Sequence, residues 1–221
     1  MNKIKSLTLL SSILLGSLTA NAADFLDTSA PENVFNIGAR VGFNLSNNSI
    51  DNTPYFKMNL SKWGTGFDAG VVCDINIRNF ISIQPGFFYQ SRSNDYAYIY
   101  TALGGDIEYY GHTRHYTFNV PILASLRLNP TDNIRWSIDF GPYFEFGLDG
   151  SDKDLSIDTK YKEDYYASRK SFDIGLKMGT GLEFFDHYYF GIHYLAGCRN
   201  IWKEDFDGRN KAWTFTLGYN F

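Results

Sequence analysis

Ten charged residues stand at alternate positions within segments that are otherwise apolar or rich in glycine. They comprise four cations and six carboxylates, namely Arg40, Asp68, Asp74, Arg127, Arg135, Asp139, Glu145, Asp173, Lys177 and Glu183. A row of acids and bases could carry a proton or ion path. The same groups could instead pair with one another as a rigid polar filling, because unpaired buried charges are very unfavourable. Which role applies depends on the elements that position them.

Histidines offer the other candidate chemistry. His112 and His115 form an H-x-x-H motif in the second long connection, near Asp95, Asp106 and Glu108, a spacing that could supply two metal ligands or a surface hydrolase pair. No third ligand has a fixed position, so we expect no metal site there. His193 is expected to be an inward-facing histidine with satisfied hydrogen bonds. Because no nucleophile elbow, paired-carboxylate cleft or phosphate-binding glycine loop appears, the sequence predicts neither an enzyme nor a cofactor.

The elements that carry the ten charges are predicted to be β-strands. Side chains of a strand point alternately to its two faces, so apolar residues at every second position indicate a strand with one apolar face. The clearest case is the final segment, where Trp213, Phe215, Leu217, Tyr219 and Phe221 alternate with small or polar residues. Eight segments show this pattern, at residues 34–45, 67–75, 81–90, 116–128, 134–148, 172–184, 188–197 and 212–221.

The connections between these segments alternate in length. Long connections are expected at 46–65, 91–115, 149–170 and 200–211, and short turns at 78–79, 129–133 and 186–187. Membrane barrels have short periplasmic turns and long outer loops. We therefore predict an all-β fold, an eight-stranded antiparallel up-and-down transmembrane β-barrel. Such a barrel is just wide enough for its own side chains, which favours a polar filling over an ion path.

The main structural alternative is a soluble lipocalin-like binding barrel, whose apolar face points inward. Three features favour the membrane. The apolar face is continuous along all eight segments, and the other face carries glycines and charges of both signs. Aromatic residues also gather at the segment ends, as membrane girdles do. The expected girdles are Tyr89, Tyr116, Phe146 and Trp213 near the loops, and Trp136, Phe184, Tyr188, Tyr219 and Phe221 near the turns.

The N-terminus reads as a secretory signal peptide over residues 1–22, followed by a barrel domain over 23–221. Lys3 and Lys5 precede an apolar run at 7–18, and a small-x-small pattern at 20–22 suits cleavage. The run is shorter than the roughly 20 residues of a spanning helix. The formal net charge of -4, without a basic face, argues against nucleic-acid binding. Two cysteines, Cys73 and Cys198, fall on different predicted strands and are expected to be free thiols.

Three stretches resemble the PorT-like outer-membrane β-barrel family of Bacteroidetes-type bacteria. They are an opening G-x-x-x-G-x-N-x-S pattern at 38–46, an apolar-Pro-apolar-Leu strand at 118–123, and the ending Leu-Gly-Tyr-Asn-Phe at 217–221. These motifs build a barrel and include no catalytic signature. The resemblance implies an outer-membrane protein connected with secretion or envelope maintenance.

The long loops are the expected working surface, because binding residues often lie in loops on a rigid scaffold. The second loop has the highest aromatic density, with Tyr96, Tyr98, Tyr100, Tyr109 and Tyr110. This loop could equally serve only to shield the mouth of the barrel. We expect a non-enzymatic, monomeric structural or interaction protein of the outer membrane. Its partners would be outer-membrane lipids and envelope proteins, secretion proteins or extracellular ligands. The alternatives are an accessory protein of a secretion or envelope-assembly machine, a small pore, and the lipocalin-like barrel.

Overall fold

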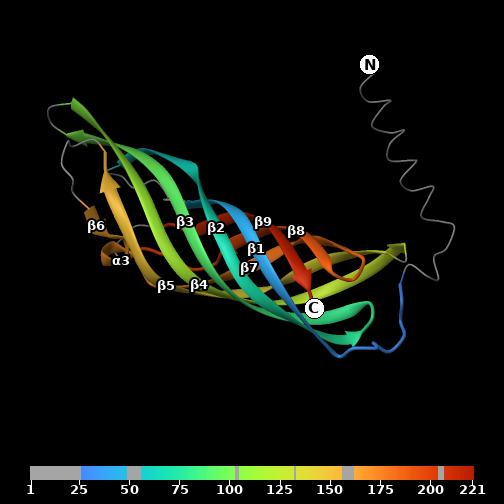
Figure 1. The fold of residues 1–221 in the computed structure, drawn as a ribbon. Helices are drawn as coiled ribbons and strands as arrows, with labels where there is room; N and C mark the ends of the chain where they lie inside the picture. The colour runs from blue at the N-terminus through green and yellow to red at the C-terminus, as the bar shows by residue number, and fades with distance from the viewer. Residues whose placement is uncertain (1–25, 49–55, 103–104, 132, 156–161, 204–206) are drawn as a thin grey trace, which may run out of the picture.

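The chain folds into an antiparallel barrel that is much taller on one side than on the other (Figure 1). The computed structural model describes residues 26–48, 56–102, 105–131, 133–155, 162–203 and 207–221, apart from the side chains at 56–61, 98–109, 154 and 162. Within these ranges the elements are β1 (Phe35–Asn48), β2 (Phe56–Arg78), β3 (Ile81–Ala102), β4 (Gly105–Thr131), β5 (Ile134–Asp154), β6 (Lys162–Asp164), α3 (Tyr165–Ser168), β7 (Phe172–Phe184), β8 (Tyr188–Gly197) and β9 (Asn210–Asn220).

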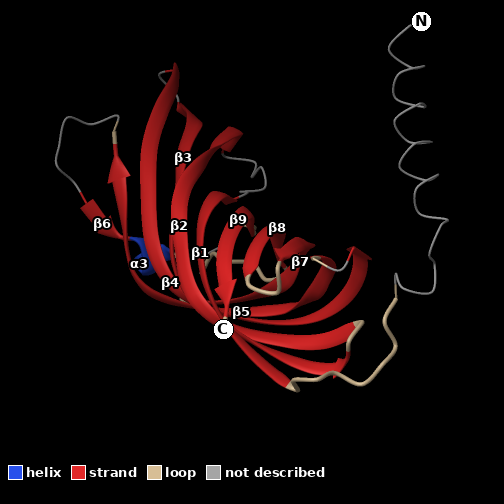
Figure 2. Cartoon of the chain, turned by 45° about the vertical axis from the view of Figure 1, so that its right-hand side comes forward, coloured by secondary structure: helices blue, strands red, loops and turns tan. Residues whose placement is uncertain are grey.

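Eight of these strands pair in a closed ring. The hydrogen-bonded order runs β4-β3-β2-β1-β9-β8-β7-β5, and β5 pairs with β4 to complete the circle. The first and last strands meet from Gly38↔Asn220 to Asn48↔Asn210. The three-residue β6 pairs only with β5, outside the ring. This arrangement confirms the predicted eight-stranded antiparallel up-and-down barrel (Figure 2).

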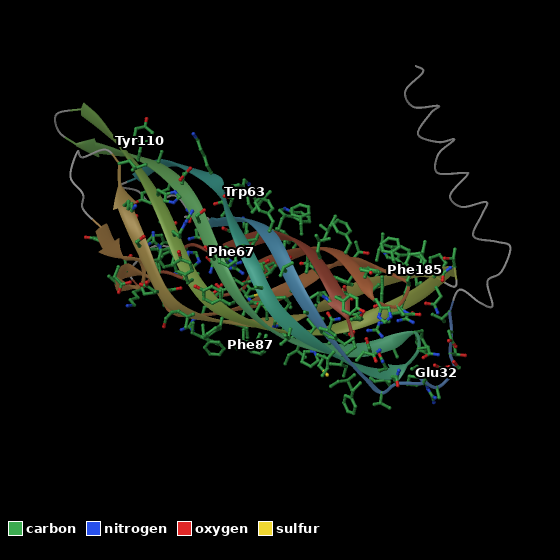
Figure 3. The ribbon with its side chains drawn as sticks, in the orientation of Figure 1. Glu32, Trp63, Phe67, Phe87, Tyr110 and Phe185 are labelled. Atoms are coloured by element: carbon green, nitrogen blue, oxygen red, sulfur yellow. The ribbon has the colours of Figure 1, made fainter. Side chains whose placement is uncertain are left out.

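Burial alternates along the strands with polar groups inside and apolar groups outside. Outward residues such as Val41, Phe140 and Leu217 are 58%, 52% and 60% exposed, whereas inward Asn44 and Asn119 are fully buried. Phe67 and Phe87 likewise project from the outer wall (Figure 3). A barrel with an apolar exterior and a polar interior suits a lipid surround. The lipocalin-like alternative, which requires an apolar interior, does not fit.

Two aromatic girdles border the apolar wall. On the loop side, Tyr89 stacks on Tyr116 with ring centroids 6.0 Å apart, and Tyr194 packs against Trp213 at 4.9 Å. On the turn side, Tyr219 contacts both Tyr188 (5.7 Å) and Phe221 (5.4 Å). Aromatic pairs at both ends of the strands are what the two membrane interfaces favour.

Four strands extend far past the loop-side girdle, which corrects the predicted strand and loop bounds. β2 to β5 have 23, 22, 27 and 21 residues, whereas β8 and β9 have 10 and 11. A membrane-spanning strand needs only about 9–11 residues. The predicted loop at 91–115 is therefore mostly β-hairpin, paired from Ser91↔Tyr116 to Ala102↔Gly105. Tyrosine and β-branched residues at 96–101 favour this strand, and its apolar alternation stops because the belt has ended.

We call this tall region the wing: residues 91–102 of β3 and 105–115 of β4, with the flanking residues 56–66 of β2 and 149–154 of β5. A register shift between Trp63 and Phe67 marks the foot of the wing on β2. Glycine is required in this shift, since a Cβ at Gly64 or Gly66 would meet the carbonyl oxygen of Ser93 or Ser91 on β3. The bulge therefore lets β2 continue beside β3 beyond the girdle.

Other predictions concern the cysteines and the N-terminus. Cys73 and Cys198 are both free, as expected. The predicted signal peptide at 1–22 lies outside the described residues and stays a prediction. In the part of the chain that the structure describes, no helix has the length and apolar character needed to cross a membrane.

An arginine introduced into the apolar wall tests whether the outer face of the barrel contacts lipid. Phe140→Arg places a charge in the middle of the outward face of β5, so we expect the free energy of unfolding in lipid vesicles to fall by about 2–4 kcal/mol. Leu148→Arg is the matched control, beyond the girdle residue Phe146, and should lower it by only about 0–1 kcal/mol. Urea titration in vesicles measures both. Equal effects at the two positions would contradict a lipid-facing wall.

Candidate functional site in the lumen and at its mouth

The barrel interior brings the ten predicted charges together. Eight are buried, and Arg135 and Glu183 are half-buried at the turn end. They form separate clusters stacked along the barrel, each with its own hydrogen-bond partners.

The cluster nearest the turns contains two ion pairs. The Arg135 guanidinium lies 2.7 Å from Glu183, which also accepts a hydrogen bond from the Asn220 amide at 2.6 Å. Arg127 lies 2.7 Å from Asp74 and donates to Asn76 at 2.6 Å. The Arg135 pair joins the neighbouring strands β5 and β7, whereas the Asn220 contact joins β9 to β7 and the Arg127 contacts join β4 to β2, in each case past an intervening strand.

The middle of the lumen is held by Asp139. Its carboxylate accepts hydrogen bonds from Ser125 at 2.5 Å and Ser137 at 3.1 Å, and His193 Nε2 lies 3.0 Å away. His193 faces inward as expected and is 3% exposed, and among the described residues its Nδ1 has no hydrogen-bond partner. Lys177 lies with its ammonium 5.0 Å from the centre of the Phe88 ring.

Further up, Arg92 and Glu145 form a fully buried ion pair with a distance of 2.8 Å. Glu145 also accepts from Asn119 at 3.2 Å, and neighbouring Asp173 accepts from Asn210 at 2.8 Å. Arg92 was missed by the sequence reasoning because the third segment was ended at residue 90. Continuing the same alternation by one step would have placed it inside.

Part of the connection between β5 and β7 turns inward at the mouth of the barrel, although this connection was expected to be a charged surface loop. The helix α3 begins after Asp164, whose carboxylate caps it by accepting from the Tyr166 N–H at 2.9 Å. Its first residue, Tyr165, points inward, is only 3% exposed, and stacks on His115 with ring centroids 4.2 Å apart. Asn48 donates to the Tyr165 hydroxyl at 2.8 Å. Burial raises the pKa of this phenol, so it remains neutral.

We call α3 together with Arg169 the plug. Arg169 holds the plug in place through three contacts. Its guanidinium lies 4.3 Å from the ring centres of both Tyr165 and Trp202 and 3.1 Å from the Asp152 carboxylate. Cation–π contacts are stronger where the groups are desolvated, and Arg169 is 4% exposed. Nothing in the sequence alone distinguishes Tyr165 and Arg169 from the other tyrosines and charges of this connection.

The H-x-x-H motif does not form a metal site. His112 and His115 lie three residues apart on one strand, so they point to opposite faces. His112 Nδ1 meets Asp95 at 2.6 Å on the outer face, whereas His115 is buried under the plug. Within the described ranges, no group of three or more His, Cys, Asp and Glu side chains could hold a metal ion.

Comparison with known proteins agrees with this architecture. The family model described as "Outer membrane protein beta-barrel domain" matches residues 22–203. Among solved structures, Ail of Yersinia pestis in complex with the heparin analogue sucrose octasulfate is 15% identical, covers 84% of this chain and 99% of its own, and has a TM-score of 0.42. OprG of Pseudomonas aeruginosa is 10% identical (88% and 99% covered, TM-score 0.48). Neisserial surface protein A is 10% identical (86% and 98% covered, TM-score 0.46). No curated protein matches the chain.

The lumenal pairing is testable with Arg127 and Asp74. Removing either partner alone, as Arg127→Met or Asp74→Leu, leaves a buried unpaired charge and should lower the free energy of unfolding in vesicles by about 3–5 kcal/mol. The double variant should lose far less than the sum, since an ion pair replaced by apolar groups is often neutral. The half-buried pair Arg135 and Glu183 is the control and should show weaker coupling. Strictly additive single effects at the Arg127 pair would refute internal pairing.

Proposed function

The chain belongs to the outer membrane protein beta-barrel domain family, and on that premise we propose that it is a closed, non-enzymatic barrel whose working surface is the wing. The observation that carries this proposal is the plug. Tyr165 fills the mouth above a lumen of paired charges, so the interior offers no route for a solute. Other molecules would then bind the part of the protein that lies outside the membrane belt, which is the wing.

The wing has the properties of a binding surface. Trp63 and Tyr110 are 45% and 49% exposed, and both lie at the tall end of the barrel (Figure 3). Large rigid aromatic side chains supply contact area with little loss of conformational entropy. The wing is also stiffened across strands, because the Tyr96 hydroxyl donates to Asp152 at 2.7 Å. The side chains of Tyr98, Tyr100 and Tyr109, predicted to belong to this surface, lie outside the described residues.

The ten lumenal charges then have a structural role. They tie strands that are two places apart in the ring, as Arg127 on β4 does with Asp74 on β2 and Arg92 on β3 does with Glu145 on β5. A rigid barrel of this kind holds the wing in one orientation at the cell surface. The wing would face outward and the short turns the periplasm, as the loop lengths favour, with the signal peptide delivering the chain to the envelope.

Site-specific photo-crosslinking in intact cells tests the wing. A photoreactive phenylalanine analogue at Trp63 or Tyr110 should give adducts with a protein or other cell-surface molecule. The same analogue at Phe87 is the matched control, since that side chain points from the apolar wall and should label only lipid. A third position, Phe185, is 61% exposed in the turn between β7 and β8.

The adduct pattern decides between the proposals. Protein adducts from the wing positions support an outer-surface interaction role. Adducts from Phe185 alone would overturn it and place the partner in the periplasm. Adducts with large envelope or secretion proteins would favour the accessory role that the PorT-like resemblance implies.

A further inference from the structure

Two cations lie beside an aromatic residue at the upper border of the apolar wall, on the short side of the barrel. Phe172 on β7 pairs in register with the girdle residue Phe146, and the two ring centroids are 5.2 Å apart. The guanidinium of exposed Arg199 lies 5.7 Å from the centre of the Phe172 ring. Lys170, one outward position above Phe172, donates to the backbone carbonyl of Asn200 at 3.2 Å. Lys170 and Arg199 therefore lie close together at the level of the loop-side girdle.

Neither of these two cations has a carboxylate partner among the described residues. The ion pairs found in that part of the chain involve the cations Arg92, His112, Arg127, Arg135, Arg169 and His193. Asp173 points inward and accepts from Asn210 at 2.8 Å. Asp207, in the connection between β8 and β9, accepts from the Asn200 amide at 2.8 Å. Because neighbouring like charges repel each other, an anion placed between the two cations would be stabilising.

Two more exposed cations occupy the same border on other strands. Lys211 on β9 is one outward position above the girdle residue Trp213, and Arg114 on β4 is one outward position above Tyr116. Asp149 on β5 also lies at this border, where its carboxylate accepts from the N–H of the next residue at 2.7 Å. The loop-side border of the wall is therefore predominantly cationic.

The turn-side border has the opposite character. Glu32 is exposed at that end of the barrel (Figure 3), and the Asp186 side chain is 72% exposed. Among the described residues of this end, Arg78 is exposed, whereas half-buried Arg135 pairs with Glu183 and Asp186. The cations are thus concentrated at one of the two membrane interfaces.

We propose that Lys170 and Arg199 bind the phosphate group of an anionic lipid in the loop-side leaflet, directly above Phe172. Arginine presents paired N–H donors that match phosphate oxygens, and lysine adds a point charge. A lipid fits this position because the apolar wall begins below Phe172, at the depth where acyl chains lie. Lys211 and Arg114 would meet further head groups around the barrel. This site needs no partner of the wing, so it can be tested independently of the proposed function.

Photo-crosslinking in vesicles identifies the lipid that contacts this border. A photoreactive phenylalanine analogue is placed at Phe172, and the protein is reconstituted in phosphatidylcholine with a minor fraction of phosphatidic acid of the same acyl chains. Mass spectrometry of the adducts then gives the ratio of the two lipids. We expect phosphatidic acid to be enriched over its bulk fraction by up to roughly 30-fold, about fivefold for each cation. The matched control is the analogue at Tyr188 in the turn-side girdle, where the adduct ratio should equal the bulk ratio.

Charge variants assign the enrichment to the two cations. Lys170→Gln combined with Arg199→Gln should return the ratio at Phe172 to the bulk value, whereas Arg199→Lys should retain most of the enrichment. If the double variant does not fold, as judged by heat-modifiable migration on a gel, Arg199→Gln alone should lower the enrichment about fivefold. Inorganic phosphate should not reduce the enrichment more than sodium chloride of equal ionic strength. A bulk ratio in the wild type, equal enrichment at Tyr188, or displacement of the lipid by inorganic phosphate would overturn the proposal.

Discussion

A charge inside an eight-stranded barrel has no bulk water to solvate it. The interior of such a barrel is just wide enough for side chains, so every inward charge must find its partners among the other inward side chains. The pairs of Arg127 with Asp74 and Arg92 with Glu145 meet this requirement at distances of 2.7 and 2.8 Å. The rest of the structure depends on this pairing of inward charges. The outer wall can be apolar because the charged residues of the strands point inward.

The same constraint determines where the protein can act. In the function that we propose, the pairs and the Tyr165 plug close the lumen, and the barrel acts as a rigid support for the wing. Because the strands differ in length, the barrel wall from β2 to β5 extends beyond the girdle (Figure 1). The plug contributes to the wing as well, because Arg169 pairs with Asp152 on β5, and Asp152 also accepts a hydrogen bond from Tyr96 on β3. Asp152 therefore contacts both the plug and the wing.

The fold was predictable from sequence because a lipid-facing wall requires period-two alternation of apolar residues. That pattern placed the inward charges from Arg40 to Glu183 without a structure. The alternation pattern failed to predict strands beyond the membrane belt, where contact with lipid no longer requires apolar residues. Above the girdle the outer face of a strand no longer meets lipid, so the apolar alternation disappears and the β3–β4 hairpin was taken for a loop. Tyr165 and Arg169 were missed for another reason: their positions arise from contacts with His115 and Trp202, which are distant in sequence and carry no periodic signal.

The closed lumen is the central claim, and ion conductance tests it most directly. Purified protein reconstituted in a planar lipid bilayer should give no stepwise current at either polarity, because paired charges and the plug leave no continuous water path. Uniform ohmic steps that scale with salt concentration would contradict the account and make the protein a small pore.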